Sequence, residues 1–252
     1  MSELSGRRAL VTGGSAGIGF MIAHGLAAAG AEVFICSRKA DACEKAAKKI
    51  AEVGSCTAVP ADLSREESWD AVAAELGAEP LHVLVNNAGA AWGAKIDDYP
   101  AAAFDKVLKL NVSAVFGLTQ RLLPALRLAA SDADPARVIN IGSIDGVRIP
   151  DFDNFAYTAS KGAIHHLTRH LAAKLAPERI TVNAILPGPF PTKMMAHVFN
   201  DPSARAEMEG SIPLGRGGEP EDIAAVANLL AGPGGRWITG ALIPVDGGLN
   251  LR

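Results

Sequence analysis

The chain has 252 residues, of which 49% are hydrophobic and 20% are charged, and its formal net charge is −3. This composition is typical of a globular protein and argues against a nucleic-acid partner. Residues 1–10 hold no apolar core, so we expect neither a signal peptide nor an anchor there. No uncharged apolar run reaches the ~20 residues that span a bilayer, so no membrane partner is expected. Three cysteines without metal-ligand spacing predict reduced thiols in a cytoplasmic protein, with no metal site.

Short apolar strands alternate with longer helical stretches along the whole chain. We predict strands at 8–12, 32–36, 55–60, 81–85, 137–141, 180–185 and 241–245. We predict helices at 18–29, 40–53, 101–130, 154–176 and 219–231, and one more that Ser64 caps. The strands are mostly apolar rather than alternating, which indicates a parallel sheet buried on both faces. The predicted fold class is α/β: one doubly wound, Rossmann-type domain over 1–252, with a seven-stranded parallel sheet and helices on both faces.

Residues 192–218 interrupt this alternation, because apolar and sulfur-bearing side chains stand there among prolines and glycines. The segment is either an irregular helical insertion that packs on the core or a lid over a substrate pocket. Connections of this length are often functional, and the motifs that suggest a chemical function precede this segment in the chain. We therefore favour the lid.

A glycine-rich segment joins the first strand to the first helix, and it reads Thr12-Gly13-Gly14-Ser15-Ala16-Gly17-Ile18-Gly19. Its glycines permit a tight turn, and the backbone N–H groups at the helix N-terminus can then bind a pyrophosphate. Glycine-rich turns without a ligand occur in many folds, which is the alternative interpretation. The position inside a strand–helix–strand unit favours a nucleotide.

Tyr157 and Lys161 are four residues apart on a predicted helix, so they project from one face. A free tyrosine has a pKa of about 10, and a neighbouring ammonium would lower it toward the range of efficient acid–base catalysis. Ser143 directly follows the fifth strand, where open α/β sheets bind ligands, and would donate a hydrogen bond to a substrate oxygen. A Tyr–Lys pair alone is usually a surface pair, but its combination with Ser143 and the glycine motif predicts a catalytic site.

These motifs resemble those of the short-chain dehydrogenase/reductase family, whose members carry T-G-x-x-x-G-x-G. The resemblance continues through Asn86-Asn87-Ala88-Gly89 and Pro187-Gly188 and covers nearly the whole chain. It implies an enzyme that moves hydride between nicotinamide and a carbonyl or alcohol, with Tyr157 as the acid. It also implies that Asn111 completes the catalytic set, its kinked backbone holding a water that links Lys161 to solvent. An Asn that merely kinks a helix is the alternative.

The resemblance further implies a cofactor site at the carboxyl ends of the strands. Asp62 would bind the adenine, the loop at Asn87 would shape the adenosine site, and Thr192 would contact the nicotinamide carboxamide. The implied cofactor-binding residues are Gly13, Ser15, Ala16, Gly17, Ile18, Gly19, Ser37, Arg38, Lys39, Asp62, Leu63, Asn87, Ala88, Gly89, Tyr157, Lys161, Pro187, Gly188 and Thr192.

The residues after the second strand favour NADP(H) over NAD(H). Ser37-Arg38-Lys39 holds no carboxylate to repel a 2′-phosphate, and it offers two cations and a hydroxyl that can bind one. A solvated basic turn is the alternative. NAD(H) also stays an alternative, because many NADP-dependent relatives carry an arginine where this chain has Ala16.

Within the family, the chain is most similar to bacterial 3-oxoacyl reductases, especially the rhamnolipid-associated type. The apolar lid suits an acyl chain, a steroid or an aromatic ketone. The similarity rests on Val33-Phe34-Ile35-Cys36, Trp92-Gly93-Ala94, Asn200-Asp201-Pro202 and Ser211-Ile212-Pro213-Leu214-Gly215-Arg216.

Other polar side chains near these motifs have simpler interpretations. We expect Arg148 to be an exposed loop arginine, and His165, His166 and His170 to lie on a surface or interface, because no acidic or thiol partners complete a metal set. Two other functions are possible for such a fold, a methyltransferase or a non-catalytic nucleotide-binding regulator. Neither would use the side chains of Ser143, Tyr157 and Lys161, so we favour the oxidoreductase.

The helices at 101–130 and 154–176 carry apolar residues around much of their circumference, so they must be buried on more than one side. In the family, these two helices form one dimer contact and the C-terminal segment at 241–252 forms a second. Two independent two-fold contacts predict a homotetramer.

Overall fold

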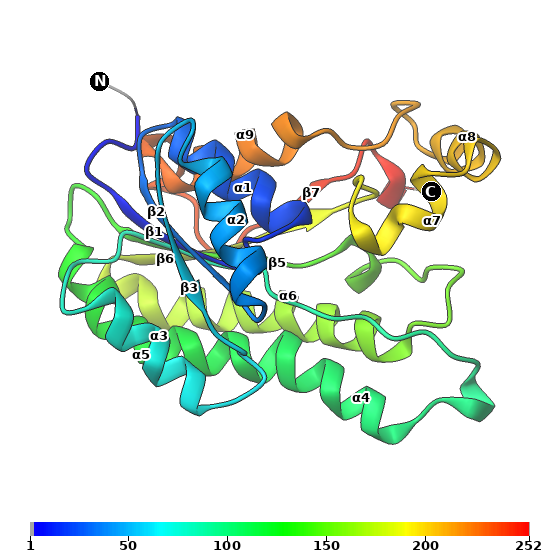
Figure 1. Ribbon diagram of the computed structural model, residues 1–252, viewed down its shortest axis with the longest axis horizontal. Helices are drawn as coiled ribbons and strands as arrows, with labels where there is room; N and C mark the ends of the chain where they lie inside the picture. The colour runs from blue at the N-terminus through cyan, green and yellow to red at the C-terminus, as the bar shows by residue number, and fades with distance from the viewer. Residues whose placement is uncertain (1–2, 252) are drawn as a thin grey trace.

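The computed structural model describes residues 3–251, which form a seven-stranded sheet between two layers of helices (Figure 1). Residues 1, 2 and 252, which belong to the predicted N-terminal segment and C-terminal contact, lie outside this range. All neighbouring strands are parallel, in the order β3-β2-β1-β4-β5-β6-β7. The predicted α/β fold class is confirmed. The strands are β1 Arg8–Thr12, β2 Glu32–Ser37, β3 Ser55–Pro60, β4 Val83–Asn86, β5 Ala136–Ile141, β6 Ile180–Pro187 and β7 Leu242–Val245.

The helices follow the strands in alternation. They are α1 Gly17–Ala28, α2 Ala40–Ile50, α3 Glu67–Leu76, α4 Ala101–Leu108, α5 Ala114–Ala129, α6 Phe155–Leu175, α7 Ala196–Phe199, α8 Pro202–Ser211 and α9 Pro220–Ala231. One layer holds α1, α2 and α9, the opposite layer holds α3 to α6, and α7 and α8 lie beyond one end of the sheet (Figure 1). Within residues 3–251, no helix combines the length and the apolar character that a membrane crossing needs.

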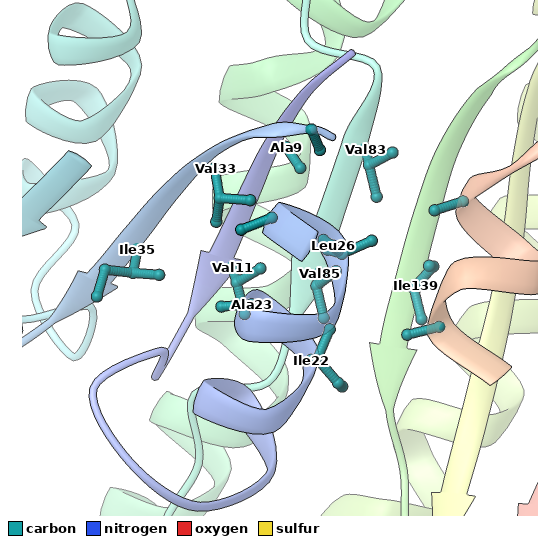
Figure 2. Close-up of a cluster of buried hydrophobic side chains, with 14 of the residues drawn as sticks. Ala9, Val11, Ile22, Ala23, Leu26, Val33, Ile35, Val83, Val85 and Ile139 are labelled. Carbon is teal, nitrogen blue, oxygen red and sulfur yellow. The ribbon is translucent and has the colours of Figure 1, made fainter. Parts of the chain in front are cut away.

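Each face of the sheet supports its own hydrophobic core. Val11 pairs with Ile35 across β1 and β2, and both belong to the core on the face that α1 covers, together with Ile22 and Leu26 of α1 (Figure 2). Leu10, which directly precedes Val11 in β1, belongs to the core on the opposite face, beneath α3, α5 and α6. Because alternate residues of one strand enter different cores, the strands are apolar throughout.

The strand order reverses at β1. The chain runs outward from β1 through β2 to β3 and then returns to β4 on the other side of β1. The loops that follow β1 and β4 therefore lead away in opposite directions and leave a crevice at the carboxyl ends of the strands. In Figure 1 this is the end of the sheet at which α7 and α8 lie.

Two local predictions are corrected by the structure. Ser64 does not cap a helix, because α3 begins at Glu67 and Ser64 turns back toward Asp62, whose Oδ1 accepts from the Ser64 N–H (3.1 Å) and hydroxyl (2.8 Å). The helix predicted at 101–130 is interrupted by a π-helical turn at Lys109–Ser113, between α4 and α5. Such turns widen the helix locally and are frequent at functional sites.

Candidate active site

A cavity of about 870 Å³ opens at the carboxyl ends of the strands. Its walls come from the loops that follow β1, β4, β5 and β6, and from the segment predicted as a lid. The predicted site residues that line it are Gly13, Ala16, Gly17, Ile18, Asn87, Ala88, Gly89, Ser143, Tyr157, Lys161, Pro187, Gly188 and Thr192.

The glycine-rich loop is held by the loop that follows β4. Gly13 has a φ of +66°, and a Cβ at this position would lie 2.6 Å from Asn87 Nδ2. That nitrogen donates to the Thr12 carbonyl at 2.8 Å, while Thr12 Oγ1 accepts from the backbone N–H groups of Asn87 and Ala88, both at 2.9 Å. These bonds fix the turn before α1, where unpaired N–H groups can bind phosphate. The sequence interpretation gave Thr12 no role, although this residue opens the motif.

Ser143 and Lys161 are both fixed by backbone groups at the end of β5. The Lys161 ammonium donates to the Ile141 carbonyl at 2.7 Å and lies 5.4 Å from the centroid of the Tyr157 ring. Ser143 Oγ accepts from the Asp145 N–H at 3.1 Å, which leaves the hydroxyl proton available for a further acceptor. The three predicted catalytic side chains therefore meet at one wall of the cavity.

The pKa of Tyr157 differs from the sequence prediction. Burial raises the pKa of Tyr157 to about 12, against the opposing effect of its hydrogen bond with Ser143, and the charge of Asp145 raises it further. Burial also lowers the pKa of Lys161 to about 8. The predicted lowering of the Tyr157 pKa by Lys161 is not seen: the hydrogen bond with Ser143 is the effect that lowers this pKa, and burial of the phenolate outweighs it. Tyr157 is therefore a protonated phenol at neutral pH.

Asn111 lies in the π-helical turn, as the implied kink requires, and is 2% exposed. Its Nδ2 donates to the Ala90 carbonyl and to Ser160 Oγ, both at 2.9 Å, and its Oδ1 accepts from the Ala90 N–H at 2.8 Å. The side chain thus ties the loop after β4 to α6, one residue before Lys161. The water between Asn111 and Lys161 stays a prediction.

The remaining predicted cofactor residues lie outside the cavity lining. They stand in the glycine loop and the first turn of α1, after β2 and after β3: Ser15, Gly19, Ser37, Arg38, Lys39, Asp62 and Leu63.

The ends of β2 and β3 form a polar corner. Arg38 is exposed, and its charge contributes to lowering the pKa of Asp62, after the larger effect of the hydrogen bond from Ser64. Ser37 Oγ is buried and has no hydrogen-bond partner. A buried hydroxyl without a partner in the described residues, followed in sequence by an exposed arginine, fits the addition of a phosphate group.

Residues 190–211 line another part of the cavity, and their side chains are mixed in character. Phe190, Met194, Met195, Val198, Ala204 and Met208 are apolar, whereas Thr192, Lys193, His197, Glu207 and Ser211 are polar or charged. Methionine side chains adapt to ligands of irregular shape.

Arg148 also lines the cavity, so the prediction of an exposed loop arginine is wrong. Its side chain is 24% exposed, and its Nε lies 3.8 Å from Asp145 Oδ1. Burial raises the pKa of Asp145, and the charge of Arg148 opposes that change.

His165 is buried, against the prediction of a surface or interface residue, whereas His166 and His170 are exposed. A sequence signal for this burial existed, because His165 follows Lys161 by four residues and so shares its helix face. In the described part of the chain, no group of three or more His, Cys, Asp or Glu side chains is placed to hold a metal ion.

Comparison with known proteins decides the family. A family model described as enoyl-(acyl carrier protein) reductase matches residues 13–250. The chain is also 51% identical over 251 residues to the rhamnolipids biosynthesis 3-oxoacyl-[acyl-carrier-protein] reductase of Pseudomonas aeruginosa, which covers 99% of this chain and 98% of that protein. The chain belongs to the short-chain dehydrogenase/reductase family. Another family member, galactitol 2-dehydrogenase (L-tagatose-forming) of Cereibacter sphaeroides, is 37% identical over 254 residues, 99% of this chain and 97% of that protein.

Solved structures of short-chain dehydrogenase/reductases extend this similarity to three dimensions. The Pseudomonas aeruginosa RhlG/NADP active-site complex has a TM-score of 0.95 at 51% identity, over 98% of each chain. A putative NAD(P)-dependent gluconate 5-dehydrogenase from Beutenbergia cavernae, with bound NADP, has a TM-score of 0.91 at 36% identity, over 99% of each chain. The similarity spans all the strands that bear the site.

Proposed function

We propose that this chain is an NADP(H)-dependent reductase that converts a 3-oxoacyl-type ketone into the corresponding secondary alcohol. The observation that carries the proposal is that Ser143, Tyr157 and Lys161 line one cavity, which the methionines of residues 192–211 also line. The 51% identity to a 3-oxoacyl reductase supports the substrate class.

Bound NADPH would supply the hydride that adds to the carbonyl carbon. Tyr157 donates its phenolic proton to the carbonyl oxygen, since its pKa of about 12 keeps it protonated at neutral pH. Ser143 donates a hydrogen bond to the same oxygen and holds it beside the phenol. Lys161, positively charged below a pH of about 8, offsets the negative charge left on Tyr157.

The polar corner at the ends of β2 and β3 supports NADP(H) as the cofactor. Ser37 Oγ lacks a partner within residues 3–251, and the exposed Arg38 follows it, so a 2′-phosphate bound there would gain a charge-assisted hydrogen bond. The NADP complexes of two similar proteins support the same cofactor.

Residues 192–218 act in this proposal as a lid over the substrate. Their methionines would contact the acyl chain, while the ketone reaches Tyr157 at the opposite wall.

A carbonyl panel tests the proposed function. We expect NADPH oxidation with 3-oxoacyl thioesters at a kcat/KM at least ~10-fold above that with keto sugars or steroid ketones, because the flexible methionines of the lining adapt better to an unbranched acyl chain than to a hydroxylated sugar or a rigid ring system. A higher kcat/KM with a keto sugar would reassign the enzyme to polyol metabolism. NADPH binding without turnover of any carbonyl would instead indicate a nucleotide-binding regulator.

The proposed enzyme is a cytoplasmic homotetramer. Unpaired thiols at Cys36, Cys43 and Cys56 support the cytoplasm. Exposed apolar side chains in two parts of the chain support an assembly of four subunits. Phe116 (46% exposed) and Leu128 (63%) lie on α5, while Leu229 (48%), Trp237 (95%) and Leu251 (83%) belong to α9 and the residues after it, where the proposal places the second, C-terminal surface.

Light scattering at micromolar concentration measures the assembly. We expect a mass of four chains of 26.0 kDa, because two independent two-fold contacts generate a closed tetramer. Trp237→Ser, which alters the C-terminal surface alone, should leave a dimer. A wild-type mass of one or two chains would refute the tetramer.

A further inference from the structure

His165 is buried between α6 and the loop that carries Ser143. Its side chain belongs to the helix turn after Lys161, and the residue is 5% exposed. A Cβ on Gly142 would lie 2.5 Å from its Nε2, and a Cβ on Gly146 would lie 2.5 Å from its Cε1. The imidazole thus occupies the space that two glycines leave open, on either side of Ser143.

A hydrogen bond joins the imidazole to the catalytic loop. The backbone N–H of Ser143 donates to His165 Nε2 at 3.4 Å, and no other acceptor for this N–H is found within residues 3–251. An Nε2 that accepts must be unprotonated, so the ring proton belongs on Nδ1.

The charges around the ring keep it neutral. Burial lowers the pKa of His165 to about 4, the charges of Lys161 and Arg169 lower it as well, and the backbone of Gly146 opposes them. Protonation would remove the acceptor and would place a second positive charge near Lys161. The contact with Ser143 is therefore present throughout the neutral pH range.

We propose that His165 is a positioning residue, which holds residues 142–146 against α6 and thereby fixes Ser143 for its bond to the substrate oxygen. His165 does not line the cavity, so it acts through Ser143 and touches neither cofactor nor substrate. The proposal rests on the proposed reductase function. Its expected signature is a loss in kcat with unchanged NADPH affinity.

A matched pair of variants separates the hydrogen bond from the packing. His165→Met and His165→Gln introduce side chains of equal length, but Gln offers a strong amide-oxygen acceptor to the Ser143 N–H, whereas the Met thioether is only a weak one. We expect kcat to fall about 10- to 100-fold in His165→Met, since small misplacements of catalytic groups cost this much, and to stay within about threefold in His165→Gln. NADPH Kd should be unchanged in both, and His170→Met, on the exposed side of the helix, should match wild type. Equal losses in the pair, or no loss in His165→Met, would overturn the proposal.

Nitrogen NMR of the wild-type protein tests the same contact without any variant. The His165 ring should be the Nδ1–H tautomer, with an unprotonated Nε2 and no titration from about pH 5 to 9. A proton on Nε2, or a titration in this range, would overturn the proposal whatever the variants do. This spectrum needs no substrate, so it still decides on His165 if the carbonyl panel refutes the proposed function.

Discussion

Tyr157→Phe is expected to lose nearly all turnover while it keeps the fold and binds NADPH as well as wild type. The substitution removes only the hydroxyl, and general acid catalysis supplies about 10²- to 10⁴-fold in rate. Steady-state reduction rates, together with a fluorescence titration of NADPH, measure both effects.

The other tyrosine of the chain, Tyr99, provides the matched control. Tyr99 donates from its hydroxyl to the Trp92 carbonyl at 3.0 Å and lies outside the cavity lining. Tyr99→Phe should therefore keep a kcat within a few-fold of wild type. Activity of Tyr157→Phe at the level of Tyr99→Phe would remove Tyr157 from the catalytic role.

Arg38→Ala is expected to weaken NADPH binding about 10- to 100-fold and NADH binding less than about twofold. Only NADPH offers the 2′-phosphate, and hydrogen bonds between charged groups contribute roughly 1.5–3 kcal/mol. Titration of both cofactors against wild type and variant gives the two ratios.

Arg65→Ala serves as the control for this prediction. Arg65 also acts on Asp62 electrostatically, but it follows β3 and its side chain is 70% exposed. Arg65→Ala should leave the affinities for NADPH and for NADH within about twofold of wild type. If Arg38→Ala weakens both cofactors equally, or if the wild type prefers NADH, Arg38 does not recognise the phosphate.

The features that the sequence could predict are those encoded locally. The apolar strands reveal a sheet buried on both faces, because Val11 and Leu10 must enter different cores. The motifs around Gly13 and Tyr157 place their residues by spacing alone, and the structure brings both motifs to one cavity.

The predictions that failed depend on distant parts of the chain. One failure is local instead: α3 begins at Glu67, and the N–H and hydroxyl of Ser64 donate to Asp62 Oδ1, two residues earlier. The pKa of Tyr157 depends on burial, to which remote loops contribute, so a neighbouring lysine could not predict it. The burial of His165 depends on two glycines about twenty residues away in sequence, so its helix spacing from Lys161 indicates the buried face but not the room for a ring there.

The weak anchoring of α7 and α8 has an evolutionary consequence. No residue of α8 is fully buried, and Val198 is the one buried residue of α7. Large losses of stability arise mainly from core changes, so substitutions on these two helices cost folding little. Substitutions can therefore change the cover of the cavity while the sheet and its reactive side chains stay in place. A scaffold divided in this way can acquire new substrates readily, and relatives of this chain are named for substrates as different as an acyl thioester and a sugar alcohol.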